Sequence, residues 1–274
     1  MSPKRSARTA IPAPLAPILV LLGVALMGGG LLVARPLGIR GVLVVSELLL
    51  ALPAVAAVLV LNIGLSDGLG LRPVAARTAF ASVALGAALW ALSLGLFELQ
   101  YTLWKPPAGY LDAFQRLHDL LKPTGPLDAL VSLLAIAIAP AVCEEVLFRG
   151  AVLPGLLRFG PAAAAVISSL LFGAIHLDKA GDGVSLYRVP FAFVVGLGLA
   201  AIRLRTGALG PAILAHATLN GITFGAAPFA GPLDGRLPDP NPLLGAGLFV
   251  AGLVASSLLF FKLLPPLTPQ RADL

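Results

Sequence analysis

The chain has 274 residues, of which 58% are hydrophobic and only 12% are charged, and its mean hydropathy is +0.96. Soluble domains carry about a quarter charged residues, so this composition excludes an ordinary water-soluble protein. The formal net charge of +6 does not indicate nucleic-acid binding, because the basic residues are spread along the turns between apolar stretches. The single cysteine, Cys143, excludes an internal disulfide.

Several stretches approach the roughly 20 apolar residues that a bilayer-spanning helix needs. They are residues 15–34, 42–65, 78–97, 129–153, 161–176, 189–204, 208–224 and 243–264. Because three of them are short, the expected number of spans lies between about six and eight. The sequence therefore predicts an all-α, polytopic transmembrane helix bundle with about eight spans, built as a single membrane domain over residues 1–274.

Basic residues give an expected orientation. Lys4, Arg5 and Arg8 precede the first apolar stretch, and with eight spans a small excess of lysine and arginine falls on the same side. The positive-inside rule then favours a cytoplasmic N-terminus. We expect a multi-pass protein embedded in membrane lipid, in the plasma membrane of a prokaryote.

The first three apolar stretches contain almost no ionisable residue except Glu47, and we interpret them as scaffold. Residues 98–128 form the longest polar connection. Apolar residues recur in it at spacings of three and four, which is typical of an amphipathic helix at the membrane surface: Leu111, Phe114, Leu117, Leu120 and Leu121. This helix either covers the bundle or gates access of a substrate.

From residue 129 to residue 224, ionisable and amide side chains interrupt apolar stretches, where each costs on the order of 2.5 to 3.5 kcal/mol. Glu145 and Arg149 are four residues apart, so they share a helix face and can pair. Glu144 points about 100° away and is left without that partner, as suits a general base in a poorly solvated cavity. We interpret residues 129–224 as the catalytic core.

Two later stretches carry histidines. Phe172 precedes His176 by four residues, and His216 precedes Asn220 by four. At about 1.5 Å of rise per residue, Glu144 and His176 lie about 20 Å from one membrane face, and the other two polar residues lie roughly 12 and 18 Å from it. The sequence therefore predicts that these polar groups meet at a similar depth.

Structural interpretations stay open for each residue. The histidines could be hydrogen-bonded packing residues, and Glu145 with Arg149 could be a structural pair only. Cys143 is expected to fill the core and not to act as a thiol nucleophile. The sequence contains neither Gly-x-Ser-x-Gly nor His-Glu-x-x-His, and Asp178 and Asp182 lie in a predicted loop, so serine, zinc-helix and aspartic mechanisms fit less well.

Three motifs follow one another in successive apolar stretches. They are Glu144-Glu145-x-x-x-Arg149, Phe172-x-x-x-His176 and His216-x-x-x-Asn220. In this order they resemble the CAAX prenyl protease and bacteriocin-processing family of intramembrane endopeptidases, whose best-known members are the type II CAAX proteases.

The resemblance implies that Glu144 and His176 activate a water against a peptide carbonyl, and that His216 and Asn220 stabilise the oxyanion. It also implies supporting roles for Glu145, Arg149 and Phe172. Members of the family are often labelled metalloproteases, and Glu144, His176 and His216 would be the ligands of a three-ligand zinc site. The spacing does not choose between the mechanisms; we favour the metal-free glutamate mechanism, with no cofactor.

The leading hypothesis is a membrane peptidase that cleaves the tail of a lipidated protein, a bacteriocin-type leader or a membrane-anchored sorting signal. One alternative is a non-catalytic scaffold or immunity-type partner, against which the complete motif set argues. Another is a proton-coupled transporter with a relay through Glu144 and His176. The lack of an inverted repeat in the sequence argues against it.

Overall fold

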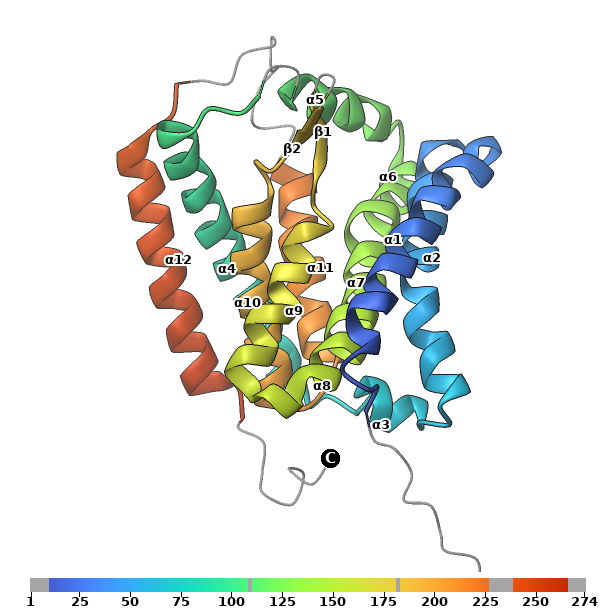
Figure 1. The fold of residues 1–274 in the computed structure, drawn as a ribbon. Helices are drawn as coiled ribbons and strands as arrows, with labels where there is room; N and C mark the ends of the chain where they lie inside the picture. Colours follow the sequence, from blue (N-terminus) through green and yellow to red (C-terminus); the bar gives the residue numbers. More distant parts are fainter. Residues whose placement is uncertain (1–9, 108–109, 181–182, 227–238, 266–274) are drawn as a thin grey trace, which may run out of the picture.

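The computed structural model describes residues 10–107, 110–180, 183–226 and 239–265, which form a helical bundle (Figure 1). Among them, 6 helical segments are long and apolar enough to cross a membrane: α1 (Leu15–Val33), Arg35–Val60 containing α2 (Gly38–Val60), α4 (Ala76–Leu103), Pro126–Phe159, α10 (Val189–Thr206) and α12 (Pro242–Leu263). The shorter helices α9 (Pro161–Ala174) and α11 (Gly210–Ala226) run beside them. The predicted all-α polytopic bundle is confirmed. The N-terminal basic cluster at residues 4–8 lies outside the described residues.

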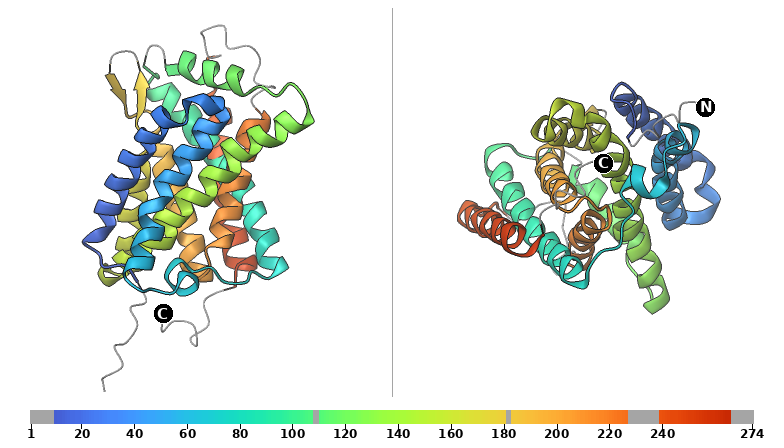
Figure 2. Two further views of the ribbon diagram at one scale, coloured as in Figure 1. Left: turned by 90° about the vertical axis from the view of Figure 1, so that its right-hand side faces the viewer. Right: turned by 90° about the horizontal axis from the view of Figure 1, so that it is seen from below.

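Paired helices form the two sides of the bundle. α1 packs on α2 at one side and α12 packs on α4 at the other, with α9, α10 and α11 between them (Figure 2). The contact between α4 and α12 depends on small residues, because a side chain at Gly95 would collide with the backbone of Phe249 and one at Gly252 with that of Leu92. Such residues let membrane helices approach closely. The short helix α3 (Leu65–Leu69) joins α2 to α4.

The helical segment Pro126–Phe159 is irregular: its irregular parts flank Glu144 and Glu145 and contain Arg149. It consists of α6 (Pro126–Leu133), a π-helical stretch (Leu134–Ile138), α7 (Ala139–Glu145), a second π-helical stretch (Val146–Val152) and α8 (Leu153–Leu156), followed by a 3-10 turn (Leu157–Phe159). Pro140 and Pro154 lack the N–H that a regular helix would donate four residues back. Two carbonyls of the second stretch accept hydrogen bonds from other helices: Ser168 Oγ donates to Phe148 O over 3.4 Å and Arg203 Nε to Arg149 O over 3.2 Å. π-helical stretches of this kind are frequent at functional sites.

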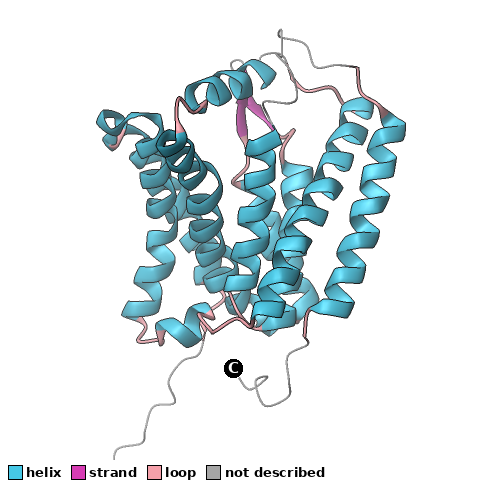
Figure 3. Cartoon of the chain, turned by 180° about the vertical axis from the view of Figure 1, so that it is seen from behind, coloured by secondary structure: helices cyan, strands magenta, loops and turns pink. Residues whose placement is uncertain are grey.

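One end of the bundle is covered by α5 (Tyr110–Leu121) and by a two-stranded antiparallel hairpin, β1 (Asp178–Ala180) and β2 (Gly183–Ser185) (Figures 1 and 3). α5 is the amphipathic helix expected in the polar connection. That connection is shorter than predicted, because α4 continues to Leu103 and α6 already begins at Pro126. Asp178 lies in a strand where a loop was predicted, and Asp182 lies outside the described residues.

The cover formed by α5 and the β1–β2 hairpin is attached to the bundle through Tyr187 and Asp178. The Tyr187 carbonyl accepts a hydrogen bond from Gln100 Nε2 of α4 over 2.6 Å, and its ring contacts that of Tyr110 at 5.2 Å between centroids. Tyr110 donates to the Asp178 carboxylate, which also pairs with Arg188 at 3.4 Å. Burial raises the pKa of Asp178, while the charge of Arg188 and the hydroxyl of Tyr110 act in the opposite direction. α5, the hairpin and the start of α10 are therefore joined by polar contacts.

Candidate active site

A cavity of about 400 Å³ lies within the bundle, between α2, α4, α7, α9, α10 and α11. Five residues of the three sequence motifs line it: Glu144, Phe172, His176, His216 and Asn220. The structure thus brings the predicted polar groups of three helices to one cavity. Glu145 and Arg149 do not line the cavity and are buried in the bundle beside it.

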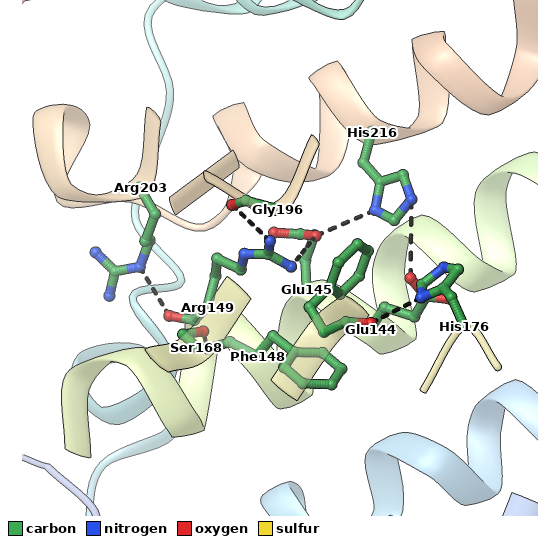
Figure 4. Close-up of polar contacts among 10 residues, drawn as sticks. Glu144, Glu145, Phe148, Arg149, Ser168, His176, Gly196, Arg203 and His216 are labelled. Atoms are coloured by element: carbon green, nitrogen blue, oxygen red, sulfur yellow. Dashed lines mark hydrogen bonds and ion pairs between the residues drawn. The ribbon is translucent and has the colours of Figure 1, made fainter. Parts of the chain in front are cut away.

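The buried pair of the first motif has the geometry expected from its spacing. Arg149 Nη1 donates to Glu145 Oε1 over 3.0 Å, and both side chains have 0% exposure (Figure 4). Arg149 Nη2 also donates to the carbonyl of Gly196 in α10 over 2.8 Å, and the guanidinium lies 4.4 Å from the centroid of the Phe172 ring. A buried charge is tolerated only when it is paired and hydrogen-bonded in this way. The pair therefore fastens the Val146–Val152 stretch to α9 and α10.

His216 lies between the two adjacent glutamates (Figure 4). Its Nδ1 is 3.1 Å from Glu145 Oε1, and its Nε2 is 3.8 Å from Glu144 Oε2. Since Glu145 Oε1 already accepts from Arg149, it acts as an acceptor, and His216 Nδ1 is assigned the proton. Nε2 is then the ring nitrogen that faces Glu144 and the cavity.

His176 is oriented by its own helix. Its Nδ1 lies 2.7 Å from the carbonyl oxygen of Phe172, which can only accept, so Nδ1 carries the proton and Nε2 has a lone pair. The Phe172 ring packs against both histidines, with centroid distances of 4.7 Å to His176 and 5.9 Å to His216. Phe172 thus separates the two imidazoles and limits their rotation.

Glu144 is the most informative residue of the cavity. It is 7% exposed, and its Oε2 has no hydrogen-bond partner among the described residues. Its neighbour Glu145 is held by Arg149 and His216, so the two adjacent carboxylates have different environments. A buried carboxylate that lines a cavity and has an oxygen without a hydrogen bond is suited to accept a proton or a hydrogen bond.

Among the described residues, no group of three or more histidine, cysteine, aspartate or glutamate side chains is placed to hold a metal ion. We therefore route no chemical step through a metal.

Two charged residues of the cavity wall were not predicted as site residues. Glu47 of α2 and Arg188 at the start of α10 both line the cavity. Glu47 is interpreted from the sequence as part of the scaffold, whereas the structure places it in the cavity wall. The signal that could have found it is its charge, since an ionisable residue within an apolar span is by default a functional candidate.

The fold and the cavity define a multi-pass integral membrane protein with a buried carboxylate and histidine site. Residues 126–222 match the family model described as type II CAAX prenyl endopeptidase Rce1-like. This segment contains all three sequence motifs, and its match confirms the family predicted from the motifs. Comparison with curated proteins and with solved structures gave no match.

Proposed function

We propose that this protein is an intramembrane endopeptidase in which Glu144 activates a water molecule for attack on a peptide carbonyl. The observation that carries the proposal is the unpartnered Glu144 Oε2 in a cavity that is also lined by His176, His216 and Asn220. The family match supports the peptidase class. The substrate would be a peptide segment at the membrane, such as the tail of a lipidated or membrane-anchored protein.

In the first step, the Glu144 carboxylate takes one proton of the water while the water oxygen bonds to the carbonyl carbon. His176 Nε2 accepts a hydrogen bond from the other water O–H, because its Nδ1 is bound to the Phe172 carbonyl. The Asn220 amide donates to the oxyanion, whereas His216 Nε2 has no proton to donate in the tautomer assigned above, in which Nδ1 donates to Glu145. Glu144 then passes its proton to the leaving nitrogen as the C–N bond breaks, which yields a carboxylic acid and an amine.

The test is cleavage of fluorogenic peptides by the purified, detergent-solubilised protein and by Glu144→Gln. The amide keeps the shape of the side chain but cannot act as a base, so we expect a loss of about 10²-fold or more in turnover with unchanged thermal unfolding. Glu98→Gln is the matched control, since Glu98 lies outside the cavity, where its Oε2 accepts from the Asn241 amide over 3.1 Å. Near wild-type turnover in Glu144→Gln would overturn the mechanism. Failure of the wild type to cleave any peptide would favour a scaffold or a transporter.

A further inference from the structure

Glu47 is a carboxylate that the proposed mechanism does not use. It lies in the middle of α2, its Oε2 is buried, and that oxygen has no hydrogen-bond partner among the described residues. It lines the same cavity as Glu144 but lies outside the segment 126–222 that matches the family. A carboxylate within an apolar span is costly unless something pairs with it.

The charged residues around the cavity indicate what charge a molecule bound beside Glu47 would carry. Glu47 and Glu144 line the same cavity, and the Oε2 atom of each has no hydrogen-bond partner among the described residues, so two carboxyl groups share one poorly solvated space without a cation bound between them. Arg188 lines the cavity too, but it is bound to Asp178 at 3.4 Å. Arg149 is bound to Glu145 and to the Gly196 carbonyl. A bound molecule that brings a positive charge between the two carboxylates would relieve their repulsion.

The remaining walls favour the same kind of molecule. Trp90 and Phe97 of α4 and Phe191 of α10 line the cavity together with Glu47. Aromatic faces attract ammonium and guanidinium groups, tryptophan most strongly, and apolar walls accommodate the methylene stem of lysine or arginine. The cavity volume of about 400 Å³ lies within the range of sites that enclose a small ligand or a short segment of a peptide.

We propose that Glu47 binds a positively charged substrate side chain, so that the protein selects peptides with lysine or arginine beside the cleaved bond. The proposal rests on the peptidase function proposed above and assigns its substrate class. Glu47 is thus a specificity-determining residue, with Glu144 left to carry the chemical step.

The experiment uses the purified full chain and fluorogenic apolar peptides that differ at one position beside the cleaved bond, which holds lysine, norleucine or glutamate. Norleucine keeps the methylene stem of lysine and lacks its charge. We expect the wild type to favour lysine over norleucine by about 10- to 100-fold in kcat/KM, the range of a charge-assisted hydrogen bond. Glu47→Gln should remove this preference by lowering kcat/KM for the lysine peptide more than for the norleucine peptide, and Glu47→Lys should favour glutamate. Glu98→Gln should keep the preference for lysine.

Binding separates this proposal from the proposed function. Glu144→Gln should bind the lysine peptide more tightly than the norleucine peptide, and Glu144→Gln combined with Glu47→Gln should bind both equally, whether or not any peptide is cleaved. A lysine preference that survives Glu47→Gln, or equal binding of the two peptides by Glu144→Gln, overturns the role of Glu47. Absent cleavage with an intact binding preference would refute the peptidase mechanism and leave the cation site standing.

Discussion

Glu145 Oε1 accepts a hydrogen bond from Arg149 over 3.0 Å and lies 3.1 Å from His216 Nδ1. One carboxylate oxygen therefore joins the helix of the first motif to the helix of the third. Glu145 does not line the cavity. By binding His216 Nδ1, it nevertheless determines that Nε2 is the ring nitrogen directed toward Glu144. Structural and functional residues are directly connected at this point.

Arg149→Ala is expected to lower the free energy of unfolding by about 3 to 5 kcal/mol, because it leaves Glu145 as an uncompensated buried charge. Thermal unfolding of the purified protein in detergent measures the effect, and the yield of folded protein should fall in parallel. The control is Arg158→Ala, because Arg158 lies at an exposed turn. Among the contacts described, its guanidinium contacts only the Phe159 ring, with Cζ 4.5 Å from the ring centroid. Unchanged unfolding of Arg149→Ala would contradict the structural role of the pair.

Asn220→Ala is expected to slow the chemical step by about 10² to 10³, with little change in substrate affinity, because the amide is proposed to donate only to the developing oxyanion. Single-turnover kinetics with excess enzyme separate binding from chemistry. Thr223→Ala is a matched control from the same helix and cavity, since the Thr223 hydroxyl donates to the Leu219 carbonyl over 2.9 Å. An increase in KM alone for Asn220→Ala would contradict the oxyanion assignment.

Metal content distinguishes the two mechanisms considered from the sequence. In the glutamate mechanism, active protein contains no stoichiometric zinc and keeps its turnover after treatment with a chelator. Elemental analysis of the wild type, His176→Ala and His216→Ala, each beside its activity, provides the measurement. If zinc is stoichiometric and is lost in parallel from both histidine variants, the metal-free mechanism is wrong and the peptidase class is retained.

Asp178→Ala is expected to loosen α5, because it removes the acceptor of the Tyr110 hydroxyl and the partner of Arg188. Amide hydrogen exchange over residues 110–121 should become faster by roughly fivefold, the effect of losing about one hydrogen bond. Exchange in α4 and α11 should not change. Asp119→Ala is the control, since this exposed residue only accepts from Gln115 within α5, over 2.9 Å, among the contacts described.

Hydropathy predicted most of the fold, because a membrane selects helices by length and apolarity, and the helix ends fall within a few residues of the predicted ones. The largest departures are the segment Pro126–Phe159, which continues past the predicted end at residue 153, and α4, which extends past Glu98 and Gln100. Hydropathy treats these residues as loop, whereas Gln100 is satisfied by the Tyr187 carbonyl over 2.6 Å. Polar residues remain helical where tertiary partners exist, and hydropathy contains no information on such partners.

The candidate site was predicted in part. Spacing of four residues placed Glu145 beside Arg149, and estimated depth brought Glu144, His176 and the third motif to one region. Glu47 could not be placed in the site from the sequence, because it precedes Glu144 by 97 positions (144 − 47) and no motif surrounds it. The contact of Asp178 with Arg188 depends on a hairpin whose strands are three residues long, which is too short for an alternation signal.

Arg188 belongs to two parts of the protein at once. It lines the cavity, and through Asp178 it is attached to the hairpin and to Tyr110 of α5. A displacement of α5 that draws Asp178 away would therefore uncover the Arg188 guanidinium and make the electrostatic potential at Glu144 more positive. The position of α5 and the electrostatic potential at the proposed base, Glu144, are therefore coupled through Arg188.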